Sequence, residues 1–350
     1  MTNVARRAAV ATIVAVSIVV LALAVWKIKL VIALLFMGFI VAAAMRPGVE
    51  WLQHRAHLPR GVGILVHYVA LAAIVAFVLW MFVPRAIDQV QQAGSTSVLH
   101  QQATHSSGIK HDLLTGLDKR LRRLPTGEQL VHPALEVTKT AFEVLIGIFF
   151  TFAVAAYWIF ERDRTIGLVQ SFVPRRHRRV TRDTWVLIDE KLGAFVRGQL
   201  LMIVFVAVVL STAFFAIGLR YWLLIGCFAG IVEIVPVIGP VTAGALAVGV
   251  GLTQSWHLAL GAGLIVAGVR QFQDYVVVPK VLGHVTGLSP LLVLVSATTI
   301  GILLGPFYVL LAVPITAVLA TLVDVVARDV DPSQQEVPTL LFTREERTRS

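Results

Sequence analysis

The residues best suited to do chemistry lie in a ten-residue stretch, IVEIVPVIGP, at 231–240. It places the carboxylate of Glu233 and the helix-breaking residues Pro236, Gly239 and Pro240 inside a long apolar run. Within a bilayer, irregular backbone is tolerated only where protein buries it or where it lines a watery cavity. Ionisable side chains at that depth typically mark a solute or ion pathway. The stretch therefore predicts a discontinuous helix whose free backbone groups and acid face a solute.

A structural role for Glu233 stays open at this point. An acid in an apolar segment is costly unless it is paired, hydrated or protonated. Arg220 and Arg270 are the two cations that flank the stretch in sequence, and either is a candidate partner. The two interpretations differ in what replacing Glu233 by glutamine removes, which is transport in one case and folding in the other.

A second polar group follows at the end of the next apolar segment, in RQFQDYVVVPKVLG, residues 270–283. Gln273 and Asp274 cannot both face lipid without penalty, so we expect at least one to face a cavity or another helix. Pro279 and Gly283 predict another break in the chain. The alternative is a span that simply ends at the lipid headgroups.

A third element, GLSPLLVL, begins at residue 287 and predicts the start of a helix. Ser289 is expected to be its N-cap and Pro290 its first helical residue. Both residues join the candidate pathway set, although their local roles need no function.

The sequence predicts neither a catalytic site nor a metal or cofactor site. The single cysteine, Cys227, lies in an apolar segment, so the chain has no thiol cluster. No HExxH motif, GxGD motif or phosphate-binding P-loop occurs. We therefore expect no enzyme activity, no cofactor, no bound metal and no direct drive by ATP.

The composition is that of a chain lying mostly within a bilayer. Of 350 residues, 57% are hydrophobic and 14% are charged, with a mean hydropathy of +0.82. Several apolar runs approach the ~20 residues that a helix needs to cross a hydrocarbon core. The alternating pattern of a membrane barrel is absent. These observations predict an all-α, polytopic helical membrane protein with about eight spans and with broken helices in its C-terminal third.

Shifts in composition divide the chain into six segments. They are 1–84 with spans one to three, 85–139 as an extracytoplasmic polar insertion with an amphipathic helix, 140–160 as span four, 161–198 as a cytoplasmic amphipathic segment, 199–326 as a membrane region with broken helices, and 327–350 as a cytoplasmic tail.

Several boundaries are predicted in more detail. Two N-terminal helices should meet in a tight turn at Lys27–Lys29, Arg46–Arg60 should form a short cytoplasmic loop, and the third span should end at Pro84. The uncharged run Val281–Val323 is too long for one perpendicular helix. It is either two limbs folded at Gly305–Pro306 or one long tilted helix.

The distribution of basic residues predicts the orientation. Between Glu161 and Arg197 the chain carries nine Lys or Arg residues against five acids, which places this interval in the cytoplasm together with both termini. An apolar stripe at helical spacing, Trp185, Ile188, Leu192 and Phe195, predicts that it forms an amphipathic helix. The basic run RRHRR has no accompanying aromatic platform, so we expect no nucleic-acid partner.

Four spaced elements carry a resemblance to a known family. KLGAFVRGQLL, IVEIVPVIGP, VVVPKVLGHVTGLSPLLVL and LLAVPITAVL occur in this order. They resemble the C-terminal signature of the autoinducer-2 exporter family of bacterial membrane proteins, also called PerM-like permeases. The matching residues are Gly198 and Gln199 of its Gly-Gln step; Pro236, Gly239 and Pro240 of its Pro-x-x-Gly-Pro break; Pro279, Gly283, Gly287, Leu288 and Pro290 of its next two elements; and Pro314 of its late Ala-Val-Pro.

The chain departs from the family pattern at three positions. Val237 stands where the family often has an aromatic residue, Ser289 where it often has histidine, and Tyr308 where a second glycine is common. These departures leave the substrate open, because a function does not transfer with a fold.

The resemblance implies a bacterial inner-membrane permease that exports a small polar solute, such as an autoinducer-2-type signalling molecule. Two alternatives remain. One is a monovalent cation/proton antiporter in which Glu233 and Asp274 take turns binding a proton and a cation, and the other is a membrane scaffold or assembly factor. The resemblance also implies a ring-like homo-oligomer, with a pentamer as one form. The expected partners are thus the lipid bilayer, a small-molecule or ion substrate and further copies of the chain.

Overall fold

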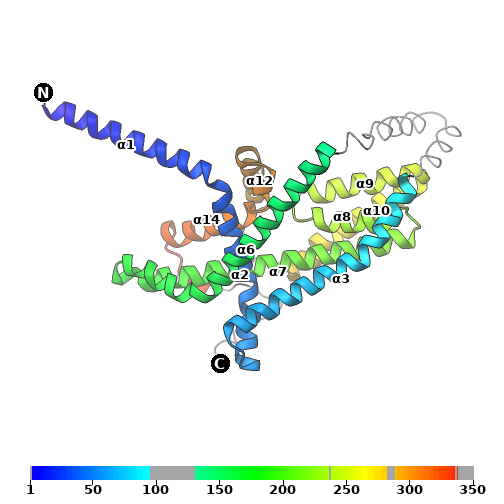
Figure 1. The fold of residues 1–350 in the computed structure, drawn as a ribbon, viewed down its shortest axis with the longest axis horizontal. Helices are drawn as coiled ribbons and strands as arrows, with labels where there is room; N and C mark the ends of the chain where they lie inside the picture. The colour runs from blue at the N-terminus through cyan, green and yellow to red at the C-terminus, as the bar shows by residue number, and fades with distance from the viewer. Residues whose placement is uncertain (1, 95–130, 236–237, 282–287, 336, 338–350) are drawn as a thin grey trace.

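The computed structural model describes residues 2–94, 131–235, 238–281, 288–335 and 337 (Figure 1). Within these ranges the secondary structure is helical throughout and contains no strand, which confirms the all-α prediction. Five described helices are long and apolar enough to cross a membrane: Val10–Lys27, Lys29–Ala56, Arg60–Val78, Lys139–Phe172 and Arg175–Ala216. The chain is therefore a polytopic helical membrane protein.

Two N-terminal helices are present as predicted, but a bend at Ile28 joins them where a tight turn was predicted, since i→i−4 hydrogen bonds reach Ile28 from both sides. Helix α1 (Thr2–Lys27) and helix α2 (Lys29–Ala56) are separated only by Ile28. Helix α1 extends away from the rest of the protein (Figure 1). From Val10 to Lys27 none of its side chains is buried, so this stretch presents an apolar surface on all sides.

The prediction of a loop over Arg46–Arg60 is wrong. Helix α2 continues through Pro47 to Ala56, and only the short turn at 57–59 precedes helix α3 (Arg60–Gly94). A proline removes a single helical hydrogen bond, and a nearby donor can compensate for the disturbed carbonyls. Here Arg197 Nη1 donates to the carbonyl oxygen of Ala44 at 3.2 Å.

Three further predicted boundaries, at 84, 160 and 198, lie inside helices. Helix α3 is described through Pro84 to Gly94, so the proline predicted to end the third span lies inside a helix. Helix α6 (Val131–Phe172) and helix α7 (Arg178–Ala216), linked by the 3-10 turn η2 (Arg175–His177), run through the predicted segment boundaries 160 and 198 without a break. Charged residues alter the environment of a helix but leave its backbone hydrogen bonds intact, so a change in composition need not end it. The predicted apolar stripe from Trp185 to Phe195 lies in α7, which continues directly into the following span.

The C-terminal third consists of short helices. These are α8 (Trp222–Val232), α9 (Ile238–Gln254), α10 (Trp256–Phe272), the π-helix η3 (Gln273–Val277), α11 (Val278–Val281), α12 (Pro290–Leu304), α13 (Pro306–Val309), α14 (Ala312–Ala327) and the 3-10 turn η4 (Pro332–Gln334). The run Val281–Val323 is folded at Gly305, which has a φ of 113°, so the first of the two alternatives is correct. Ser289 caps α12, with Oγ accepting from the N–H of Leu292 at 3.3 Å, as predicted.

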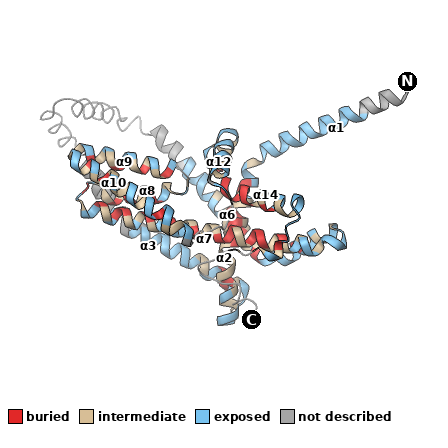
Figure 2. Cartoon of the chain, turned by 180° about the vertical axis from the view of Figure 1, so that it is seen from behind, coloured by how far each residue is buried: buried red, intermediate tan, exposed pale blue. Residues whose placement is uncertain are grey.

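Helix α7 is the central element. One end packs with α8, α9 and α10 around Phe214 and Ala229, and the other packs with α2 and the α13–α14 region around Leu192 and Leu311. A third cluster around Val49 joins α2, α3 and α6. Burial concentrates along these contacts, while the outer faces of α1, α3 and α6 are largely exposed and apolar, as expected for lipid-facing surfaces (Figure 2). The amphipathic helix predicted within 85–139 lies outside the described residues.

Candidate functional site

The break between α8 and α9 is built by local hydrogen bonding. After Val232 the chain tightens, with the N–H of Ile234 donating to Ile231 and that of Val235 donating to Val232 at 3.4 and 3.0 Å. Such i→i−3 bonds are typical of a helix terminus. Helix α9 restarts at Ile238, so the predicted discontinuous helix is confirmed. Pro236 and Val237 lie outside the described residues.

Gly239 allows the two limbs of the break to approach closely. A Cβ added there would lie 2.8 Å from the carbonyl carbon of Val232 and 3.0 Å from the Cα of Glu233, and it would overlap the Val232 carbonyl oxygen. Any side chain would therefore push the end of α8 away from the start of α9. Pro240 follows directly and lines the small cavity beside the break.

The carboxylate of Glu233 lies at this break and is held by α10 and the π-helix. Its Oε1 accepts from Arg270 Nη1 at 3.0 Å and from Gln273 Nε2 at 2.6 Å. Its side chain is only 9% exposed. Of the two predicted partners, Arg270 makes the contact. A charge-assisted pair of this kind compensates much of the cost of placing an acid in an apolar segment.

Arg270 also joins a second acid to the cluster. Its Nε donates to Asp274 Oδ2 at 2.9 Å, and Asp274 is about half exposed. Gln273 is 3% exposed, so the expectation that one of the pair Gln273 and Asp274 faces protein is confirmed. The sequence offered no nearby acid to pair with Glu233, but folding brings Asp274 to the other side of the same guanidinium group.

A π-helix positions the second half of this cluster. It begins at Gln273, directly after α10, and leads into α11. This wider turn is a common local feature of functional sites. Helix α11 follows it without interruption and contains Pro279 as its second residue, so the break predicted at Pro279 does not occur there. Nothing in the periodicity of the sequence indicated the π-helix, although Pro279 required some adjustment of the preceding turn.

Gln199 ties the break to α7. Its Nε2 donates to the backbone carbonyl oxygen of Glu233 at 3.2 Å. That carbonyl lies at the C-terminal end of α8, where helical partners are missing. Gly198 is buried beside it. Gln199 of the Gly-Gln step thus supplies a hydrogen-bond donor to the C-terminal end of α8.

The site is closed in this structure. The cavity that touches Glu233, Pro240, Arg270 and Gln273 has a volume of about 20 Å³, which is room for one water molecule. A solute would need the break and α10 to separate.

The other candidate residues lie elsewhere or are not described. Ser289 caps α12, and Pro314 is buried in α14, with which α12 packs. Pro290 begins α12, and nothing is described of its side chain. Pro236, Gly283 and Gly287 lie outside the described residues.

A second charged cluster, which the sequence analysis missed, joins α2, α6 and α7. Asp189 Oδ2 accepts from Arg162 Nε at 2.6 Å and from Arg46 Nη1 at 3.1 Å. The side chains of Asp189 and Arg162 are only 4% and 10% exposed. Arg46 also pairs with Glu50 at 2.5 Å.

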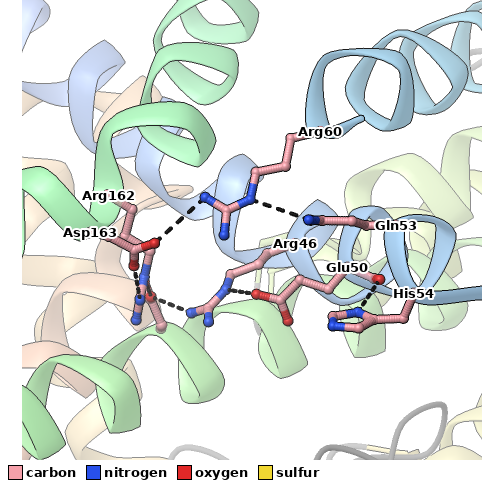
Figure 3. Close-up of polar contacts among 8 residues, drawn as sticks. Arg46, Glu50, Gln53, His54, Arg60, Arg162 and Asp163 are labelled. Carbon is pink, nitrogen blue, oxygen red and sulfur yellow. Dashed lines mark hydrogen bonds and ion pairs between the residues drawn. The ribbon is translucent and has the colours of Figure 1, made fainter. Parts of the chain in front are cut away.

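The rim of this cluster reaches α3 (Figure 3). Arg60 Nη1 lies 3.5 Å from Asp163 Oδ2, and Arg60 Nε donates to Gln53 Oε1 at 3.3 Å. The available sequence signal was the position of Asp189, one turn after Trp185 on the apolar stripe. An acid on a buried face requires a buried cation.

A family comparison decides the class of protein. A family model described as AI-2E family transporter matches residues 15–328 of the 350. The chain belongs to the AI-2E transporter family. This AI-2E family member is 24% identical over 305 residues to a Bacillus subtilis protein named "Putative transport protein YrrI", covering 83% of this chain and 85% of the relative. It is also 26% identical over 316 residues to "Putative transport protein YueF" of the same organism, covering 82% of this chain and 83% of that relative. Membership in a transport family and the long apolar helices together establish a multi-pass membrane protein of the permease class.

Proposed function

We propose that the chain is a permease of the bacterial inner membrane that exports a small polar solute of the autoinducer-2 type. The observation that supports this proposal most is the Glu233 carboxylate, held by Arg270 and Gln273 at a break in an apolar helix. Buried hydrogen-bonding groups at a helix break are what a polar solute needs to replace its water.

In this proposal the structure is the closed state of the pathway. Arg270 and Gln273 donate hydrogen bonds to the Glu233 carboxylate while no solute is present, and the cavity of about 20 Å³ excludes anything larger than water. A solute with several hydroxyl groups can replace these hydrogen bonds as α9 separates from α10. Asp274, which already binds Arg270, holds the guanidinium group while Glu233 turns to the solute.

One feature favours cation/proton antiport as a second candidate. Arg270 contributes one positive charge to the cluster and the two acids contribute two negative charges, so the group has a net charge of −1 when all three are ionised. A proton or a monovalent cation would neutralise it. Competition between the two for Glu233 and Asp274 is the basis of coupled exchange.

Orientation and assembly belong to the same proposal. The salt-bridged cluster around Asp189 combines residues of 46–60 and 161–198, both of which the distribution of basic residues assigns to the cytoplasm. We place both termini and 327–350 on that side, and 85–139 outside. The exposed apolar side chains of α1 support further association, and we propose a ring-like homo-oligomer, with a pentamer as the form to test.

The test is flux in proteoliposomes with wild type, Glu233→Gln and the control Glu161→Gln, which changes an exposed acid on α6. A pH-sensitive dye inside reports protons, and a panel of small hydroxylated metabolites and monovalent cations is supplied. We expect metabolite flux in wild type and in the control, and a loss of about tenfold or more in Glu233→Gln, since a hydrogen bond to a charged group contributes about 1.5–3 kcal/mol.

Other outcomes discriminate between the functions. A dye response to sodium or lithium that disappears in Glu233→Gln favours antiport. Absence of any flux in a correctly inserted wild type contradicts both transport functions and favours the scaffold.

A further inference from the structure

A large apolar cavity lies between α2, α6, α7 and α14, remote in sequence from the Glu233 cluster. Its volume is about 970 Å³, near the upper end of the range of about 300–1,000 Å³ for ligand pockets. Its walls include Phe36 and Phe39 of α2, Trp158 of α6, Trp185 of α7 and Leu322 of α14. A cavity of this size and composition suits an aliphatic chain and not a small polar solute.

Two indole rings on its wall retain polar groups without partners. Trp158 and Trp185 stack with centroids 5.7 Å apart, and Phe39 meets both rings edge-on. Both indole nitrogens are buried and have no hydrogen-bond partner among the described residues. Because neither nitrogen has accessible surface, the two rings present only carbon atoms to the cavity.

A strongly basic run of residues adjoins the cavity. His177 and Thr181 line the cavity, and they belong to the run 175–182, which contains five arginines and no acid. Arg175, Arg176 and Arg179 are exposed. Basic residues clustered at a membrane surface attract anionic lipid headgroups.

Nearby acids reduce this charge but do not cancel it. Arg179 lies 3.7 Å from Asp183, and Asp329 lines the cavity. The backbone N–H of Ser333 holds the pKa of Asp331 below its usual value, with a smaller effect from Arg179, so this acid is ionised at neutral pH. Three acids against five arginines leave this region with a net positive charge.

We propose that this cavity binds one anionic phospholipid, independently of the transport function. Its acyl chains lie against the wall formed by Trp158 and Trp185, and its phosphate lies against the arginines of 175–182. A zwitterionic lipid fits the apolar wall equally well but lacks the net charge that these arginines select.

Quenching of tryptophan fluorescence by brominated lipids tests the proposal on the full-length protein. The protein is reconstituted in vesicles of phosphatidylcholine with increasing phosphatidylglycerol, where either lipid carries the brominated chains. We expect brominated phosphatidylglycerol to quench more strongly than brominated phosphatidylcholine at equal mole fraction. The excess should disappear in Trp158→Phe/Trp185→Phe, although five of the seven tryptophans remain.

A charge variant tests the headgroup separately and leaves the apolar wall intact. Arg175→Gln/Arg176→Gln/Arg179→Gln should lower the relative affinity for phosphatidylglycerol about tenfold or more, and raised salt should weaken the wild-type preference. The control removes three exposed charges elsewhere, in Arg55→Gln/Lys139→Gln/Arg220→Gln, and should keep the preference.

Three results would overturn the proposal. They are equal quenching by the two brominated lipids, excess quenching that persists without Trp158 and Trp185, and an unchanged preference in the charge variant. Absence of quenching at these tryptophans by any lipid would mean that protein, such as a second copy of the chain, occupies the cavity.

Discussion

Replacing Asp189 by asparagine tests whether the buried salt-bridged cluster holds α2, α6 and α7 together. The change keeps the shape of the side chain and removes its charge. Arg46 retains Glu50, but the 10% exposed Arg162 loses its buried partner. Removing one member of a buried pair typically costs about 3–5 kcal/mol, because the other charge stays buried.

This cost translates into a measurable change in melting temperature. At about 2–4 °C per kcal/mol, the expected decrease in Tm is about 6–20 °C, at the lower end for a chain of this length. The assay is a thermal melt of detergent-solubilised protein followed by tryptophan fluorescence, at one scan rate for all variants because unfolding of such proteins is commonly irreversible.

Two further variants make the result specific. Asp183→Asn removes an acid whose partner, Arg179, is 86% exposed, and should cost about 1 kcal/mol or less. The double variant Asp189→Leu/Arg162→Met removes both buried charges and should recover much of the lost stability. The cluster does not stabilise the fold in this way if Asp189→Asn has the same Tm as the Asp183→Asn control. The same conclusion follows if the double variant is no more stable than Asp189→Asn.

Two more predictions concern the break between α8 and α9. Gly239→Ala should lower the free energy of unfolding by about 1–3 kcal/mol and reduce flux, because the added Cβ overlaps the Val232 carbonyl. The control Gly249→Ala, in open space on the same helix, should leave the melting temperature and flux near wild type. Equal behaviour of the two variants in both assays would contradict the close approach. Gln199→Leu should cost about 1 kcal/mol through loss of the donor to the Glu233 carbonyl and should slow flux in the same liposome assay; a lower Tm with wild-type flux would restrict Gln199 to a structural role.

The sequence predicted the features that depend on local chemistry. Prolines and glycines located the break after Val232 and the fold at Gly305, and a serine before a proline located the cap of α12. Arg270 was one of two predicted partners of Glu233. These results follow from short-range geometry that the residue types impose directly.

The features that depend on tertiary contacts were not predictable in the same way. Pro47 and Pro84 lie inside continuous helices, because each removes one hydrogen bond from a helix otherwise held by packing. Asp189 finds Arg46, 143 residues earlier in the chain, only once α2 and α7 are packed. The basic residues of 161–198 indicated an orientation, but their pairing could not be derived from their number.

The uninterrupted course of α7 has a mechanical consequence. Asp189 and Gln199, which contact the two charged clusters, lie ten residues apart on this helix, about 15 Å along its axis. Over three turns a helix with intact hydrogen bonds acts as a rigid rod, because appreciable bending requires a kink. A tilt of α7 about Asp189 would therefore displace Gln199 and, through its hydrogen bond, the Glu233 carbonyl. The Asp189 cluster would stay in place during such a tilt and act as its pivot.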